Sequence, residues 1–275
     1  MLRKLIKHEL RATARVMGPM LLLTLASAVG GNVAVHHLVE SEAAALNVIG
    51  VFLLMAFFAA IAGAFIVSFV LMIQRFYKNL LRDEGYLMMT LPASVHEHVF
   101  SKLFVAILWA AATAVTAILA MFILVFEMEF VDLIFHDLWT LLNEAQFDGM
   151  RLMDFAGNTM VFILEMILLM IIADACLCLQ LYASMAAGHS FTHHKGLLSV
   201  AAWFAFSTAW NMLQNGTLYL FHAIMPEGIS FGLNGISQLA AMHITLCGMM
   251  ILLLIPTGIW YAVTVCFLKK RLNLD

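Results

Sequence analysis

Two acidic side chains lie within a long apolar stretch of this chain. Glu165 and Asp174 stand among Leu, Ile and Met residues, nine positions apart. Ionisable groups inside a membrane segment are costly and often serve as cation or proton sites, although hydrogen bonding across a helix contact can also hold them. Nine residues correspond to two and a half helical turns, so we expect the two carboxyl groups to face nearly opposite sides of one helix.

A second group of polar side chains lies in another apolar stretch. Asn211, Gln214 and Asn215 follow an i, i+3, i+4 spacing, which places them on one face of a helix. Such a face could line a polar path, or it could join two helices by hydrogen bonds. Together with Glu165 and Asp174, these residues are the candidate translocation path.

Motifs of several enzyme classes are absent from the sequence. It contains no G-x-x-x-x-G-K-[ST] nucleotide loop, no H-E-x-x-H zinc motif and no G-x-S-x-G nucleophile motif. The four cysteines lie in apolar stretches, and Cys176-Leu177-Cys178 does not have the spacing of a metal site. We therefore expect no catalytic residues, no metal and no cofactor on this chain, and no nucleic-acid partner.

The composition is typical of a membrane protein. The chain is 64% hydrophobic and 11% charged, with a mean hydropathy of +0.98, whereas soluble domains carry about 25% charged residues. Helices satisfy their own backbone polar groups in lipid, so we expect an all-α membrane protein with one transmembrane domain over residues 1–275. A span needs about 20 mainly apolar residues, and six segments qualify: 16–37, 47–73, 103–126, 156–187, 197–222 and 238–268.

The positions of Lys and Arg predict the orientation. Basic residues gather before the first span, between the second and third, and after the sixth, whereas only Arg151 falls on the opposite side. Cytoplasmic loops carry an excess of Lys and Arg. We therefore expect both termini in the cytoplasm.

The first 15 residues are expected to form an amphipathic helix that lies flat at the inner surface of the membrane and contacts its lipids before the chain turns into the first span. Its basic residues lie apart from its apolar side; they are Arg3, Lys4, Lys7, Arg11 and Arg15. On the opposite side of the membrane, the loop 127–155 is acidic and has apolar residues at helical spacing, which predicts a short helix on the outer leaflet.

The loop 74–102 mixes both signs of charge with turn residues, so it cannot lie in a bilayer. Its first part prolongs the second helix, and the sequence Asp83-Glu84-Gly85 then ends it. The stretch from Tyr86 to Leu91 is uncharged and closed by Pro92. Ser94 with Glu97 three residues later has the pattern of a capping box at the start of the third helix. An apolar patch between charges favours a docking site for another protein, although it could also lie under its own helices.

These residues resemble a known family. The run Asp83-Glu84-Gly85-Tyr86-Leu87, then Thr90-Leu91-Pro92-Ala93-Ser94, then Lys102, is similar to the loop of ABC-2 type transporter permeases. The stretch from Phe76 to Leu87 looks most like permeases of Gram-positive bacteria that are associated with antimicrobial-peptide export or immunity. Six spans and a basic amphipathic N-terminus also match. The motif covers about 25 residues, and the architecture covers the whole chain.

The resemblance implies the ABC-2 permease fold, of the type V exporter kind, as a multi-pass protein of the bacterial cell membrane. Two permeases pair, either two copies of one chain or two related chains, and each binds a separate ABC ATP-binding subunit that holds ATP and magnesium. The exported substrate would be amphipathic, such as a peptide or a lipid-like molecule. The residues implied to couple the permease to the ATPase are Asp83, Glu84, Gly85, Tyr86, Leu87, Met88, Met89, Leu91 and Pro92.

Two other functions fit the sequence. A membrane protein that binds a ligand or confers immunity would need no energy source. A secondary transporter driven by protons would use Glu165.

Overall fold

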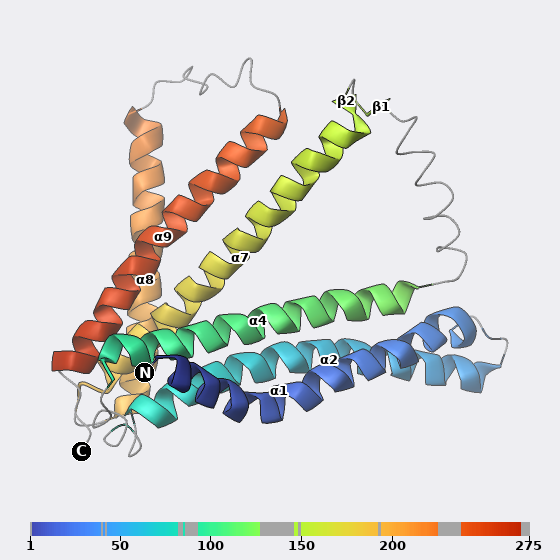
Figure 1. Ribbon diagram of the computed structural model, residues 1–275, viewed down its shortest axis with the longest axis horizontal. Coiled ribbons are helices and arrows are strands. Elements are labelled where there is room, and N and C mark those ends of the chain that lie inside the picture. Colours follow the sequence, from blue (N-terminus) through green and yellow to red (C-terminus); the bar gives the residue numbers. More distant parts are fainter. Residues whose placement is uncertain are drawn as a thin grey trace. The chain divides into compact units, whose positions relative to one another are not determined.

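The computed structural model describes residues 2–39, 41, 43–81, 85, 93–126, 146–147, 150–191, 194–224 and 238–270. In these residues six helices are long and apolar enough to cross a membrane, which makes the chain a multi-pass membrane protein. The helices are α1 (Leu2–Val33), α2 (Ala44–Phe76), α4 (Val95–Val125), α7 (Leu152–Gly188), α8 (Lys195–Ile224) and α9 (Gln238–Lys270) (Figure 1). Single π-helical segments, η1 (Ala34–Leu38) and η2 (Tyr77–Leu81), extend α1 and α2.

The prediction of six helical spans is confirmed, but most helices are longer than their apolar segments. The second helix continues through η2 to Leu81, and α4 begins at Val95 rather than near residue 103. At 1.5 Å per residue, the 31 residues of α4 extend about 46 Å, compared with about 30 Å of hydrocarbon. Hydropathy marks only the part of a helix that lipid can surround, whereas backbone hydrogen bonds carry the helix further.

The N-terminal segment does not turn before the first span. The predicted interfacial segment 1–15 and the predicted span 16–37 belong to one continuous helix, α1, which includes Pro19. Glu9, Thr13 and Met17 are buried on one side of it. The five basic residues of this segment are all exposed; they are Arg3, Lys4, Lys7, Arg11 and Arg15. Their position at a membrane surface stays a prediction.

The prediction of an all-α chain is confirmed by the six long helices, and the described residues add only one short strand pair. A pair of two-residue strands, β1 (Gln146–Phe147) and β2 (Met150–Arg151), pairs antiparallel just before α7. The pairing joins Gln146 to Arg151 and Phe147 to Met150. The helix predicted on the outer leaflet within 127–155 falls largely on residues outside the described ones.

The chain divides into two compact units, and residues 2–72 with 104–157 form one of them. In this unit α1, α2 and α4 run alongside one another (Figure 1). Their core is a cluster of Ala28, Phe57, Ala120 and Leu124, packed against further apolar side chains. Gly31 allows the close approach, because a Cβ there would lie 2.8 Å from a methyl carbon of Leu124. Small residues at such contacts let helices pack closely in lipid, where dispersion contacts replace the hydrophobic effect.

The end of α4 is held by a side chain from α1. The amide nitrogen Nδ2 of Asn32 lies 3.0 Å from the carbonyl oxygen of Ile123, 3.2 Å from that of Leu124 and 2.8 Å from that of Phe126. The last carbonyls of a helix have no partner within the helix. Asn32 therefore serves as a cap supplied by a neighbouring helix.

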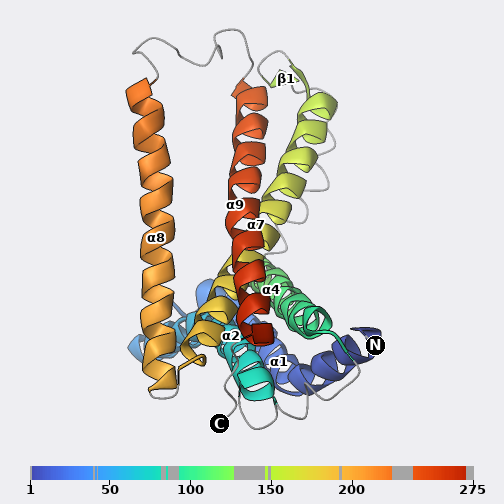
Figure 2. The same cartoon turned by 90° about the vertical axis from the view of Figure 1, so that its left-hand side faces the viewer.

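Residues 73–103 and 158–275 form the other unit. It contains α8, α9 and most of α7 (Figure 2), together with the end of α2, η2 and the first turns of α4. The rings of Phe76 and Tyr182 stack at 4.0 Å with an interplanar angle of 7°. Tyr182 is followed on α7 by a continuous buried stretch that reaches Gly188 and consists of small residues apart from Met185. This end of α7 is thus the most enclosed part of the helix.

The cap on α4 can be tested by Asn32→Ala, which we expect to lower the free energy of unfolding by about 1–3 kcal/mol, the cost of leaving partly buried carbonyl groups unsatisfied. Asn32→Asp should cost more, because a carboxylate has no donor to offer and repels the carbonyl oxygens. The measurement is unfolding in detergent followed by circular dichroism. Asn211→Ala is the matched control, because the Asn211 amide donates to the carbonyl of Ser207 in its own helix. A loss no larger than that of the control would contradict the capping role.

Candidate functional site

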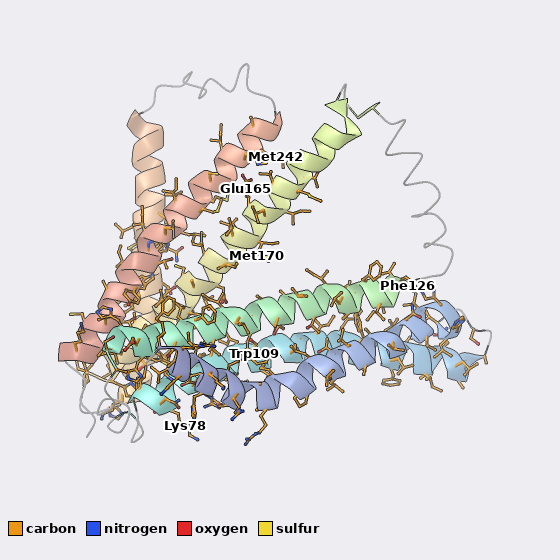
Figure 3. All side chains as sticks on the ribbon, in the orientation of Figure 1. Lys78, Trp109, Phe126, Glu165, Met170 and Met242 are labelled. Carbon is orange, nitrogen blue, oxygen red and sulfur yellow. The ribbon has the colours of Figure 1, made fainter. Side chains whose placement is uncertain are left out.

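The structure gives the acidic residue Glu165 of α7 a partner on α9. Its Oε2 atom lies 2.7 Å from Nδ1 of His243. The side chains of His243 and Glu165 retain 23% and 14% of their accessible surface, respectively. In Figure 3, Glu165 and Met242, the neighbour of His243, lie on facing stretches of α7 and α9. Of the two interpretations of Glu165, the contact supports a hydrogen bond across a helix contact.

Asp174 lies in a different setting on the same helix. The sulfur of Cys178, one turn further on, lies 3.9 Å from its Oδ2 atom. The two carboxyl groups of α7 therefore have different partners, which agrees with the prediction that they face different sides. The structure does not join Glu165 and Asp174 into one path.

The amide cluster on α8 is largely exposed. Asn211 and Asn215 are exposed, and Gln214 is half-buried. The contact between α7 and α8 instead involves Gln180, whose Nε2 atom donates to Oγ of Ser207 at 2.7 Å. Two of these three candidate path residues thus lie on an exposed surface of α8, and the third is partly covered.

The predicted capping box at the start of α4 is confirmed. The backbone N–H of Glu97 donates to Oγ of Ser94 at 3.2 Å, and the N–H of Ser94 donates to Oε2 of Glu97 at 3.0 Å. Among the predicted coupling residues, Gly85 is buried and helical. The other eight lie outside the described residues; they are Asp83, Glu84, Tyr86, Leu87, Met88, Met89, Leu91 and Pro92.

A polar chain connects the start of α4 to the end of α9. His96 Nδ1 lies 2.8 Å from the hydroxyl of Tyr261, and its Nε2 lies 3.1 Å from Nζ of Lys269. A charged Lys269 can only donate, so Nε2 accepts that bond and Nδ1 carries the proton that is donated to Tyr261. This arrangement holds one end of α9 against the beginning of α4.

The turn between α7 and α8 encloses a histidine. His189 is 3% exposed, and its Nδ1 lies 2.9 Å from the carbonyl oxygen of Met185. The ring of Tyr77 meets the His189 ring edge-on at 5.2 Å. Burial lowers the pKa of His189; the bond to Met185 opposes this shift, and the positive charge of Lys195 adds to it.

Sequence reasoning missed His243, because a lone histidine in an apolar run carries no pattern. The only available signal was its position within the sixth span, where any ionisable residue is unusual. Among the described residues, no group of three or more His, Cys, Asp and Glu side chains is placed to hold a metal ion. The arrangement provides a hydrogen-bonded acid–histidine pair between α7 and α9 and a polar anchor where α4 begins.

The close turn between α7 and α8 predicts that alanine substitution is destabilising at Gly188 but tolerated at Gly196. A Cβ at Gly188 would collide with the side chain and backbone of Ser199, whereas one at Gly196 would meet nothing within 4 Å. We expect Gly188→Ala to lower the midpoint of thermal unfolding in detergent by several degrees and Gly196→Ala to leave it nearly unchanged, apart from a small change in helix propensity. Equal midpoints for the two variants would contradict this packing.

The buried His189 predicts a pH dependence of stability. Its folded-state pKa lies below the ordinary value of 6.5, so the unfolded chain binds this proton more readily. Stability is therefore lost as the pH falls through 6.5, because the unfolded state gains the proton before the folded state does. In His189→Asn the amide can still donate to Met185 but does not titrate, so its unfolding midpoint should fall less as the pH is lowered. Parallel curves for wild type and variant would contradict the assignment.

No protein-family model, no curated protein and no solved structure matches this chain.

Proposed function

We propose that this chain is the membrane permease subunit of an ATP-driven ABC exporter of the ABC-2 type. It couples to a separate ATP-binding subunit through the loop 74–102 and pairs with a second permease, either another copy or a related chain. ATP and magnesium bind on the partner, and both termini of the permease lie in the cytoplasm. The substrate is amphipathic, such as a peptide or a lipid-like molecule.

The observation that carries the proposal is the anchoring of the charged and apolar loop sequence at both ends. Before it, η2 ends in three buried residues, Asn79, Leu80 and Leu81. After it, α4 begins with the capping box of Ser94 and Glu97 and continues into buried His98 and Val99. A partner that moves residues 82–92 would thus displace the ends of α2 and α4, because both ends of the loop are packed or capped.

Energetic coupling sets a condition on this contact. An ATPase can shift the permease between two states only if it binds one of them more tightly than the other. The anchored ends favour such discrimination, because a change at the loop must be accompanied by a change in the packing around η2 or in the first turns of α4. The network of His96, Tyr261 and Lys269 would extend that change to α9.

The test is a double substitution, Tyr86→Asp with Leu87→Asp, in the full chain purified from its native membranes. We expect loss of the co-purifying ATPase and at least a tenfold decrease in ATP turnover per permease, because charges in an apolar contact remain unpaired when desolvated. Phe191→Asp is the matched control: Phe191 is an exposed apolar residue of the turn between α7 and α8, on the same predicted side of the membrane. An intact complex with normal ATP turnover in the double variant would contradict the coupling role.

Transport assays in the same membranes distinguish the two other functions. A proton-driven transporter would lose transport when the proton gradient is collapsed with ATP present, and again in Glu165→Gln. A binding or immunity protein would keep its function when ATP is removed. An ABC exporter should keep transport when the proton gradient is collapsed with ATP present, and it should lose transport when ATP is removed.

A further inference from the structure

We propose that Glu165 and His243 form one proton-binding site that joins α7 to α9 inside the membrane, and that loss of the shared proton loosens this contact. The proposal concerns the pair itself and does not depend on an ATPase partner. Under each of the proposed functions, the contact between α7 and α9 would then depend on pH.

The geometry of the pair is that of a strong, direct hydrogen bond. Glu165 Oε2 and His243 Nδ1 are 2.7 Å apart, which is at the short end of the range for a charge-assisted N–H···O bond. Histidine is the side chain whose charge ordinarily changes near neutral pH. With both the carboxylate and the imidazolium charged, the pair is neutral as a whole.

Loss of one proton changes this balance. The pair then carries a net charge of −1 within the apolar part of the bundle, where an uncompensated charge is costly. Water can reduce that cost only by reaching the pair, which is already largely covered by its neighbours. Deprotonation is therefore coupled to an opening between α7 and α9, and closure of the two helices favours the proton-bound form.

Within two helical turns of the pair, the described parts of α7 and α9 carry no other charged side chain. Along α7 the next ionisable group toward Gly188 is Asp174, which contacts Cys178 in its own helix. On α9 the nearest is the thiol of Cys247, one turn from His243 and exposed. The stretch 196–216 of α8 contains no titratable side chain. The carboxylate and the imidazole therefore control each other's charge.

The pair lies nearer to one end of each of its helices than to the other. Glu165 is the fourteenth of the 37 residues of α7 (Leu152–Gly188), and His243 is the sixth of the 33 residues of α9 (Gln238–Lys270). Both spans start at the predicted outer surface and end near the polar anchor of His96 and Lys269 on the predicted cytoplasmic side. With the predicted orientation, the pair would therefore lie closer to the outer ends of α7 and α9 than to their cytoplasmic ends.

The experiment is a pH titration of the full chain in lipid nanodiscs, labelled with ¹⁵N-histidine, with the His243 signal assigned by its loss in His243→Asn. In wild type the charge state of His243 should follow the pH differently than in Glu165→Gln, because the variant lacks the carboxylate that faces the imidazole. Asp174→Asn is the control and should leave the His243 signal unchanged. A His243 signal that never changes charge between pH 5 and pH 9, or that titrates identically in Glu165→Gln, would overturn the proposal.

A second measurement covers the possibility that Glu165→Gln folds poorly. The unfolding midpoints of wild type, Glu165→Gln, His243→Asn and the double variant form a double-mutant cycle. Their coupling should be larger at pH 6 than at pH 9, because the carboxylate favours the proton-bound imidazole and that gain is lost as the pH rises. Coupling that is equal at both pH values would mean a fixed hydrogen bond and would overturn the proton site.

Discussion

Backbone hydrogen bonding in a solvent without water is the constraint on which the rest of this structure depends. Within lipid each N–H and C=O group must find a partner in the protein, and a continuous helix is the simplest arrangement that supplies one. This explains why α1 runs from Leu2 to Val33 without a turn between its basic and apolar parts. The constraint is hardest to meet where a helix ends, and there Asn32 supplies donors to the carbonyls at the end of α4.

Polar side chains in the bundle follow the same constraint. Five buried threonines donate their hydroxyl groups to carbonyl oxygens one turn earlier in their own helices; they are Thr13, Thr24, Thr113, Thr116 and Thr264. Such residues occupy helix contacts without requiring a partner across the contact. Thr13 also accepts a bond from the indole of Trp109 at 2.7 Å, which ties α1 to α4. Polar residues with a partner on another helix therefore show which helices are held together, and Glu165 with His243 is one such pair.

The proposed functions place two different events at opposite ends of the spans. A partner at the loop 74–102 would act on η2 and the start of α4, close to the polar anchor on α9. The acid–histidine pair lies near the other end of α7 and α9. Since α9 takes part in both sites, a change in its position is the physical route by which they could influence one another.

Short-range patterns in the sequence were sufficient for the local features. The number and approximate positions of the six spans depend on runs of apolar residues, and the capping box depends on Ser94 and Glu97, three residues apart. The ends of the helices were less predictable, because polar residues such as Arg75 and Lys78 extend a helix beyond the part that hydropathy marks. The short strand pair before α7 was missed, because four paired residues carry too little pattern to be separated from a loop.

The sequence by itself thus determined that the chain is helical, crosses the membrane and carries costly polar groups in its spans. It did not determine which of those groups meet. His243 is 78 residues from Glu165, and the carbonyl of Ile123 is 91 residues from Asn32. These contacts depend on how whole helices pack, and in lipid many packings bury similar apolar surface. Only the tertiary structure decided that Glu165 contacts a histidine of another helix, whereas Asp174 contacts a cysteine of its own helix.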